Sequence, residues 1–122
     1  MRIKMNLEDV VISVAQKEGW AVTIKRRSEE DIIFNFEKST PEGRDFYFSV
    51  GTSNNSLCLL IDNILEYYQK YDPDYQAYLW IRSDGHWKIS ELCHIEDIVE
   101  DMKAAAEMVY QLYDALSDIY DA

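Results

Sequence analysis

The feature that most constrains the fold is the stretch 94–120, whose apolar residues recur at intervals of three and four. This spacing places them along one side of an α-helix, because successive helical residues are about 100° apart. The stripe consists of Ile95, Ile98, Met102, Ala105, Val109, Leu112, Leu116 and Ile119, widened by Val99, Tyr113 and Tyr120. We therefore expect one long amphipathic helix whose apolar side is buried against the rest of the domain.

The opposite side of this helix is expected to be acidic. Carboxylates spaced four residues apart repel each other by a few tenths of a kcal/mol, and Lys103 is the only lysine or arginine from Glu91 onward. Carboxylates on successive turns are about 5–6 Å apart, comparable with the phosphates of a DNA strand. The row permits mimicry of nucleic acid; the alternative is a face that only keeps the protein in solution. Its members fall within an arc of about 60°: Glu96, Glu100, Glu107, Asp114, Asp118 and Asp121.

Length and composition predict one folded domain, residues 1–122. The chain is 48% hydrophobic, which favours a packed core over disorder. No apolar run approaches the roughly 18–20 residues of a membrane span, and no apolar block near the start resembles a secretory signal. Two cysteines, Cys58 and Cys93, are too few for a disulfide framework. We therefore expect a cytoplasmic protein with reduced thiols.

The net charge of −11 comes entirely from one part of the chain. Residues 1–44 contain eight acids and eight bases, whereas residues 45–122 contain fifteen acids and four bases. Such a field repels nucleic acid and membrane surfaces and attracts basic protein surfaces. The expected partner is a basic surface, most simply that of a nucleic-acid-binding host protein, with no direct binding of nucleic acid or membrane.

The first half of the chain predicts a helix followed by three strands. A helix over about 7–18 begins after Asn6, which is suited to cap it, and ends at Gly19. The apolar period then changes to two, with polar turns at 28–31 and 40–45. Short connections between alternating segments are typical of an antiparallel meander. The residues of the predicted buried face are Trp20, Val22, Ile24, Ile32, Phe34, Phe36, Phe46, Phe48 and Val50.

The second half predicts helices. A helix over about 56–71 is followed by Asp72-Pro73-Asp74, a favourable helix start. Residues 75–81 fit a short helix, with a fourth strand as the alternative, and residues 83–93 form a loop or a brief extended piece. The predicted fold is a small α+β domain of order α-β-β-β-α-(α)-α, in which helices cover one face of a three-stranded antiparallel sheet.

No arrangement of residues predicts a reaction, a cofactor or a metal site. The only soft ligands are Cys58, His86, Cys93 and His94, which lack the paired spacing of zinc sites. Cys58 is expected to be a small buried residue of the second helix. We therefore assign no catalytic residue, no cofactor and no metal, and expect a protein that is not an enzyme.

Tyrosines gather in and after the second predicted helix, at positions 67, 68, 71, 75 and 78, next to Trp80. Tyrosine and tryptophan are favoured anchors of protein interfaces. Stacking on nucleic-acid bases is implausible here because the neighbouring residues are acidic. Tyr67 and Tyr71 are our candidates for exposed partner-binding anchors; the alternative is that these rings belong to the core.

Three stretches resemble a family of small acidic proteins of phages, plasmids and integrative elements of gut and Gram-positive bacteria, most of which have no assigned activity. They are FNFEKSTPEGRDFYFSV, LCLLIDNILEYYQKYDPDYQAYLWI and HIEDIVEDMKAAAEMVYQLYDAL, and the resemblance covers about residues 30–118. The family tends to have a glycine-rich loop where this chain has residues 86–92, so a shared loop function does not carry over. Its most specific pieces are Thr40-Pro41, Gly43, Asp45-Phe46, Phe48 and Asp72-Pro73-Asp74.

The resemblance implies that the protein is an accessory protein of a mobile element. Some small acidic accessory proteins of such elements block host defence nucleases. Together with the acidic helix, it favours a non-enzymatic inhibitor that occupies a basic nucleic-acid-binding surface of a CRISPR or restriction nuclease. The alternative is a structural or regulatory interaction module that oligomerises or pairs through its C-terminal helix, since the apolar stripe also fits a heptad repeat. Both a monomer and a homodimer are compatible with the sequence.

Overall fold

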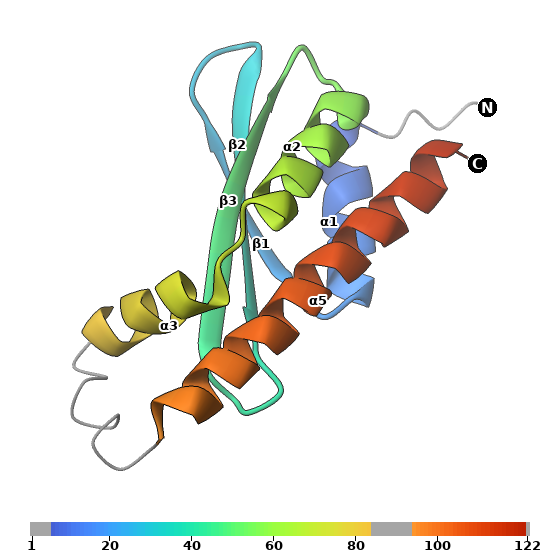
Figure 1. Ribbon diagram of the computed structural model, residues 1–122. Coiled ribbons are helices and arrows are strands. Elements are labelled where there is room, and N and C mark those ends of the chain that lie inside the picture. Colours follow the sequence, from blue (N-terminus) through green and yellow to red (C-terminus); the bar gives the residue numbers. More distant parts are fainter. Residues whose placement is uncertain (1–5, 84–93, 122) are drawn as a thin grey trace.

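The computed structural model describes residues 6–83 and 94–121 and shows helices on one side of an antiparallel sheet (Figure 1). Helix α1, Leu7–Lys17, begins where the Asn6 side chain accepts a hydrogen bond from the Asp9 backbone amide at 2.9 Å. It ends before Gly19, whose φ of +90° is a conformation that glycine adopts without strain. The predicted first helix and both of its ends are therefore confirmed.

The three strands form a meander in the order β1-β2-β3. Strand β1 is Ala21–Arg26, β2 is Asp31–Ser39 and β3 is Asp45–Ser53. Both pairings are antiparallel, and Phe36 lies opposite Val22 on β1 and Phe48 on β3. The period-two pattern works as predicted, because alternate residues of β2 and β3 are buried against the helices while their neighbours face away.

Helix α2, Leu57–Gln69, starts at Ser56, whose hydroxyl accepts a hydrogen bond from the Leu59 amide at 3.0 Å. Helix α3, Pro73–Arg82, starts at Asp72, whose carboxylate accepts one from the Asp74 amide at 3.0 Å. Residues 75–81 are therefore helical, as favoured, and the alternative of a fourth strand is excluded. The capping carboxylate and a proline at the first helical position favour a helix start over continued strand.

Helix α5, Ile95–Asp121, is the longest element and packs against α1, α2 and α3 (Figure 1). The predicted apolar stripe faces the core along most of its length: Ile98, Ala105, Val109, Leu112 and Leu116 are all 0% exposed. Ile95 and Ile119, at the two ends, are exposed. The stripe is thus used within the domain, and coiled-coil pairing through it would require the helix to leave the core.

The predicted burial of Cys58 is wrong, and the predicted loop over 83–93 is largely untested. Cys58 is exposed on α2 rather than buried, because it lies on the side of the helix away from Leu60, Ile61 and Ile64. The predicted loop over 83–93 falls, apart from Ser83, outside the described residues. The α+β class, the element order and the one-sided helical cover are those that the sequence predicts.

Replacing Leu112 by alanine should lower the free energy of unfolding by about 2–5 kcal/mol, because it leaves a cavity at a fully buried position. Ile119→Ala on the same helix is the matched control and should change it by less than about 0.5 kcal/mol, since half of that side chain is already exposed. Urea denaturation measures both values. Equal effects would contradict the placement of the stripe.

Candidate functional site: the acidic face of helix α5

Five carboxylates of α5 form an exposed line that we call the acidic row: Glu96, Glu100, Glu107, Asp114 and Asp118. All five lie roughly opposite the buried stripe, as about 100° per residue requires. The sixth predicted member, Asp121, is the last residue of α5, and its side chain is outside the described part of the structure. The structure therefore brings the described acidic candidates to one surface.

The acidic row is not evenly spaced along the helix. At about 1.5 Å of rise per residue, Glu96 and Glu100 are about 6 Å apart, and so are Asp114 and Asp118, whereas Glu107 stands about 10.5 Å from its neighbours on either side. Lys103 and Tyr110 occupy the intervening positions of the same face and are exposed. The row extends over about 33 Å, which is about the length of one turn of B-DNA.

The charge of the acidic row is only partly neutralised within the domain. Lys103 Nζ lies 2.8 Å from Glu100 Oε1, and this contact raises the pKa of the Lys103 ammonium through the hydrogen bond and the charge of Glu100. None of the salt bridges among residues 6–83 and 94–121 involves Glu107, Asp114 or Asp118. Glu96 is in none of these salt bridges either, so Glu100 is the one described member of the row that is paired with a cation of the described residues.

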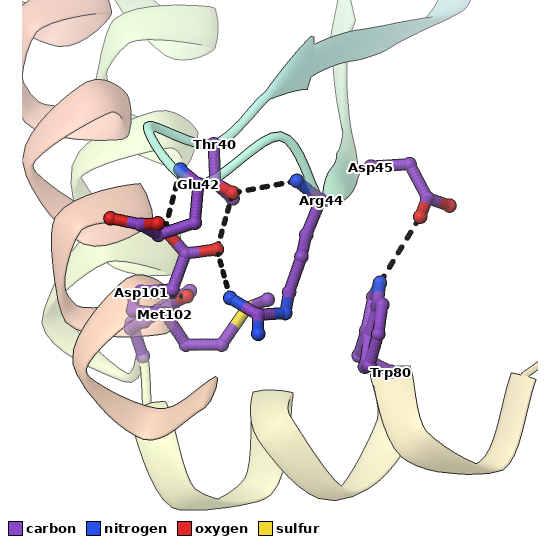
Figure 2. Close-up of polar contacts among 8 residues, drawn as sticks. Thr40, Glu42, Arg44, Asp45, Trp80, Asp101 and Met102 are labelled. Atoms are coloured by element: carbon purple, nitrogen blue, oxygen red, sulfur yellow. Dashed lines mark hydrogen bonds and ion pairs between the residues drawn. The ribbon is translucent and has the colours of Figure 1, made fainter. Parts of the chain in front are cut away.

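A buried polar cluster, which the sequence did not predict, holds α5 in register with the β2–β3 hairpin (Figure 2). Asp101 is 3% exposed, and its Oδ2 accepts hydrogen bonds from the Thr40 hydroxyl and, at 2.9 Å, from Arg44 Nη1. Its Oδ1 accepts one from the Glu42 amide at 3.2 Å. The only signal in the sequence was an acid on the apolar side of the helix, between Ile98 and Ala105.

The same cluster reaches α3. The Arg44 guanidinium lies over the Trp80 ring, 5.2 Å from its centroid, and the Trp80 indole Nε1 donates a hydrogen bond to Asp45 Oδ1 at 3.1 Å (Figure 2). Contacts of this type combine cation–π attraction with a charge-assisted hydrogen bond. The hairpin, α3 and α5 are thereby joined around one arginine, and the outward direction of the acidic row follows from this arrangement.

Tyr67 and Tyr71, predicted as exposed anchors, are instead half-buried and pack against the core. Tyr67 stacks on Phe48 with ring centroids 4.7 Å apart, and the Tyr71 hydroxyl donates a hydrogen bond to the Met102 carbonyl at 2.7 Å. Burial raises the pKa of Tyr67 to about 12 and raises that of Tyr71 further, with the charges of Tyr67 and Asp101 contributing to the latter. The alternative reading, that these rings belong to the core, is the one the structure favours.

Other tyrosines border the acidic row. Tyr110 lies between Glu107 and Asp114 and is 41% exposed. Its ring contacts Tyr68 of α2, with centroids 5.2 Å apart, and Tyr113, at 5.6 Å. Sequence reasoning named the tyrosines of the second predicted helix and missed Tyr110, because its helical position, rather than its neighbours in sequence, places it beside the carboxylates.

The described residues contain neither a cluster of metal ligands nor a helix that could span a membrane. No three His, Cys, Asp or Glu side chains within it are arranged to hold a metal ion. His94 is exposed at the start of α5, whereas His86 and Cys93 lie outside the described residues. Of the described helices, none combines the length and apolar character that crossing a bilayer requires.

Comparisons with known proteins add no assignment: no family model, no curated protein and no solved structure matches the chain. The resemblance to small acidic proteins of mobile elements therefore stays a prediction from the sequence.

Asp101→Asn should lower the free energy of unfolding by about 3 kcal/mol or more, because it leaves the largely buried Arg44 without its counter-charge. Asp97→Asn, at an exposed position one turn earlier, removes the same charge and should change the free energy of unfolding by less than about 0.5 kcal/mol. Chemical denaturation of both variants tests this. A small effect at Asp101 would mean that the cluster does not hold the hairpin against α5.

The raised pKa of Tyr67 predicts loss of stability in alkali. Its folded-state pKa of about 12 exceeds the unfolded value of about 10. The stabilisation is therefore complete below about pH 10 and is lost as the pH rises through about 12. Urea unfolding at several pH values between 8 and 12 should show this fall, and Tyr67→Phe should reduce its slope. An undiminished fall in Tyr67→Phe would contradict this prediction.

Proposed function

We propose that the protein is a non-enzymatic binding protein of a mobile element that inhibits a host defence nuclease, of CRISPR or restriction type. It does so by placing the acidic row on the basic surface where the nuclease binds nucleic acid. The observation that supports this most directly is the exposure of Glu107, Asp114 and Asp118 without an ion-pair partner among the described residues. Its site of action is the cytoplasm.

The electrostatic argument concerns what such a row recognises. A line of negative charge about 33 Å long attracts an extended basic surface and accelerates the encounter with it. Basic channels that bind nucleic acid have this shape and charge, because they neutralise regularly spaced phosphates. The row itself repels nucleic acid, so the proposed partner is the protein that binds nucleic acid and not the nucleic acid.

Tyr110 supports the same surface as a contact site. It is a half-exposed aromatic ring between two carboxylates, held in place by Tyr68 and Tyr113. Such a ring can stack on an arginine guanidinium while neighbouring carboxylates pair with it. This role replaces the one that we assigned to Tyr67 and Tyr71 from the sequence.

The second candidate function is an interaction module without an inhibitory role. Its coiled-coil version is disfavoured because the apolar stripe is buried in the domain's own core. A version that uses the exposed ends of α5 is supported by Ile95, Ile119 and Tyr120, each at least half exposed. Molar-mass measurement at low concentration tests the homodimer version of this candidate, since a strict monomer removes it.

Reversing the acidic row should abolish inhibition. The triple variant Glu100→Lys, Glu107→Lys, Asp114→Lys changes the net charge from −11 to −5, because each reversal adds two charges. We expect it to weaken binding to the target nuclease at least about 100-fold, while binding of the original protein weakens at least about tenfold as salt rises from about 0.05 to 0.5 M. Nuclease cleavage assays and calorimetry measure both effects.

The matched control is Glu29→Lys, Glu30→Lys, Glu37→Lys, which makes the same change in net charge at exposed positions away from α5. It should retain inhibition within about threefold, because nearby charges contribute more than distant ones. Equal loss in both triple variants would show that net charge, and not the acidic row, is recognised. Binding to the target nuclease that does not weaken as the salt concentration rises would contradict the proposal.

A further inference from the structure

Strand β3 forms one edge of the sheet, so one side of its backbone lacks a partner strand. Two hydrogen bonds fix which groups face outward: the Thr40 amide donates to the Arg44 carbonyl at 2.7 Å, and the Asn54 amide to the Glu30 carbonyl at 2.9 Å. Bonded and non-bonded pairs alternate along an antiparallel ladder. Even-numbered residues of β3 therefore bond to β2, and the backbone groups that point away belong to Asp45, Tyr47, Ser49, Gly51 and Ser53.

One outward group is already used. The Asn63 side-chain amide donates a hydrogen bond to the Gly51 carbonyl at 2.7 Å, which closes this part of the edge. Within the described part of the chain, no hydrogen bond uses the outward backbone groups of Asp45, Tyr47 or Ser49. An edge with unpaired amides and carbonyls is a template for an added strand.

A groove runs beside the same residues, between the edge of β3 and helix α3. Its volume is about 210 Å³, larger than the apolar cavity of roughly 150 Å³ that accommodates benzene in another protein. It is therefore large enough for one large apolar side chain. The apolar part of its lining is Phe46, Phe48, Tyr67, Leu79, Trp80 and Met102.

The two features have the geometry of strand addition. Phe46 and Phe48 face the helices, whereas Tyr47, which is 70% exposed, faces the open side of the sheet. A strand added beside β3 would place alternate side chains into the groove and next to Tyr47, because neighbouring residues of a strand point to opposite faces. Strand addition of this kind takes its affinity from main-chain hydrogen bonds and its specificity from such pockets.

The charge of this region indicates what the added strand carries. Residues 45–83 contain five acids and two bases, Lys70 and Arg82. Lys70 pairs with Glu66 at 2.7 Å, and Arg82 lies over the Tyr78 ring, 5.5 Å from its centroid. The Lys70–Glu66 pair cancels one base and one acid, and Asp45 is the charged residue among the described residues that line the groove. An occupant with lysine or arginine matches this surface and the net charge of the protein.

We propose that the groove beside β3 binds an extended segment of a partner protein as a fourth strand, with one large apolar side chain in the groove and basic residues on either side. This contact is separate from the acidic row, which lies on the outward face of α5. It gives the protein a second recognition site. This site recognises the backbone and side-chain shape of the partner, whereas the acidic row recognises charge.

The test uses an eight-residue peptide that alternates lysine and threonine around a central phenylalanine. At about 150 mM salt, where distant charges are screened, it should bind and slow hydrogen exchange of the Tyr47 and Ser49 amides at least about tenfold. Replacing the phenylalanine by alanine should weaken binding about tenfold, the loss expected for one buried apolar side chain. No binding at millimolar peptide, or no added protection at these amides, overturns the proposal.

Two further peptides test the strand pairing itself. One carries N-methyl groups on its odd residues and the other on its even residues, so that only one of them loses the amides that face β3. We expect one peptide to lose binding and the other to keep it. Equal behaviour of the two peptides would exclude pairing with the strand edge.

Leu79→Lys and Leu59→Lys form a matched pair of variants, because both leucines are 39% exposed on helices and only Leu79 lines the groove. Leu79→Lys should weaken peptide binding at least about tenfold, and Leu59→Lys should change it less than about twofold, with circular dichroism confirming that both fold. The pair Glu107→Lys, Asp114→Lys should leave peptide binding within about threefold, which separates this site from the acidic row. Self-association that Leu79→Lys abolishes, without peptide binding, would identify a second copy of the chain as the occupant and overturn the proposal.

Discussion

The arrangement of the domain depends on one buried charge. Asp101 is buried on the apolar side of α5, and a carboxylate there is tolerable only where Arg44 and Thr40 contact it. Buried ion pairs are weak evidence for stability, because desolvation offsets much of their attraction. This pair instead fixes the position of α5 relative to the β2–β3 hairpin. Rotating or sliding α5 by one residue would leave both charges uncompensated. The apolar stripe alone is broad enough to permit such a shift.

The fixed rotation of α5 determines which surfaces are presented. With Asp101 inward, the acidic row must point outward, and Tyr110 stands between its carboxylates. Arg44, held by Asp101, lies over Trp80 and so places α3 beside the start of β3, where the groove forms. The two proposed recognition sites therefore share a structural origin, although they use different elements and different chemistry.

Much of the fold follows from local pattern. Periodicity predicted the long helix and the meander, and Asp72-Pro73-Asp74 favoured a helix where composition alone left a strand possible. The acidic row was predictable because helical spacing places its members without knowledge of the partner element. Tyr67 and Tyr71, predicted as exposed anchors, are half-buried against the core, which composition could not indicate because it does not say which side of α2 meets β3. In the Asp101 cluster, the hydrogen-bonded partners are separated by 57 to 61 positions in the sequence. At that separation, no local pattern in a single sequence indicates which residues will meet.

The position of α5 after the sheet has a consequence for synthesis of the protein. Chains emerge from the ribosome from their N-terminus and fold domain by domain. The phenylalanines of β2 and β3 cannot be fully buried until Ile98, Leu112 and the rest of the apolar stripe have been synthesised. Helix α5, which carries this stripe, is translated last among the described elements. Until then the meander presents an aromatic face and two strand edges to solvent, and Arg44 has no carboxylate from α5. The nascent chain is thus most exposed to aggregation and to chaperones in the interval before α5 is complete.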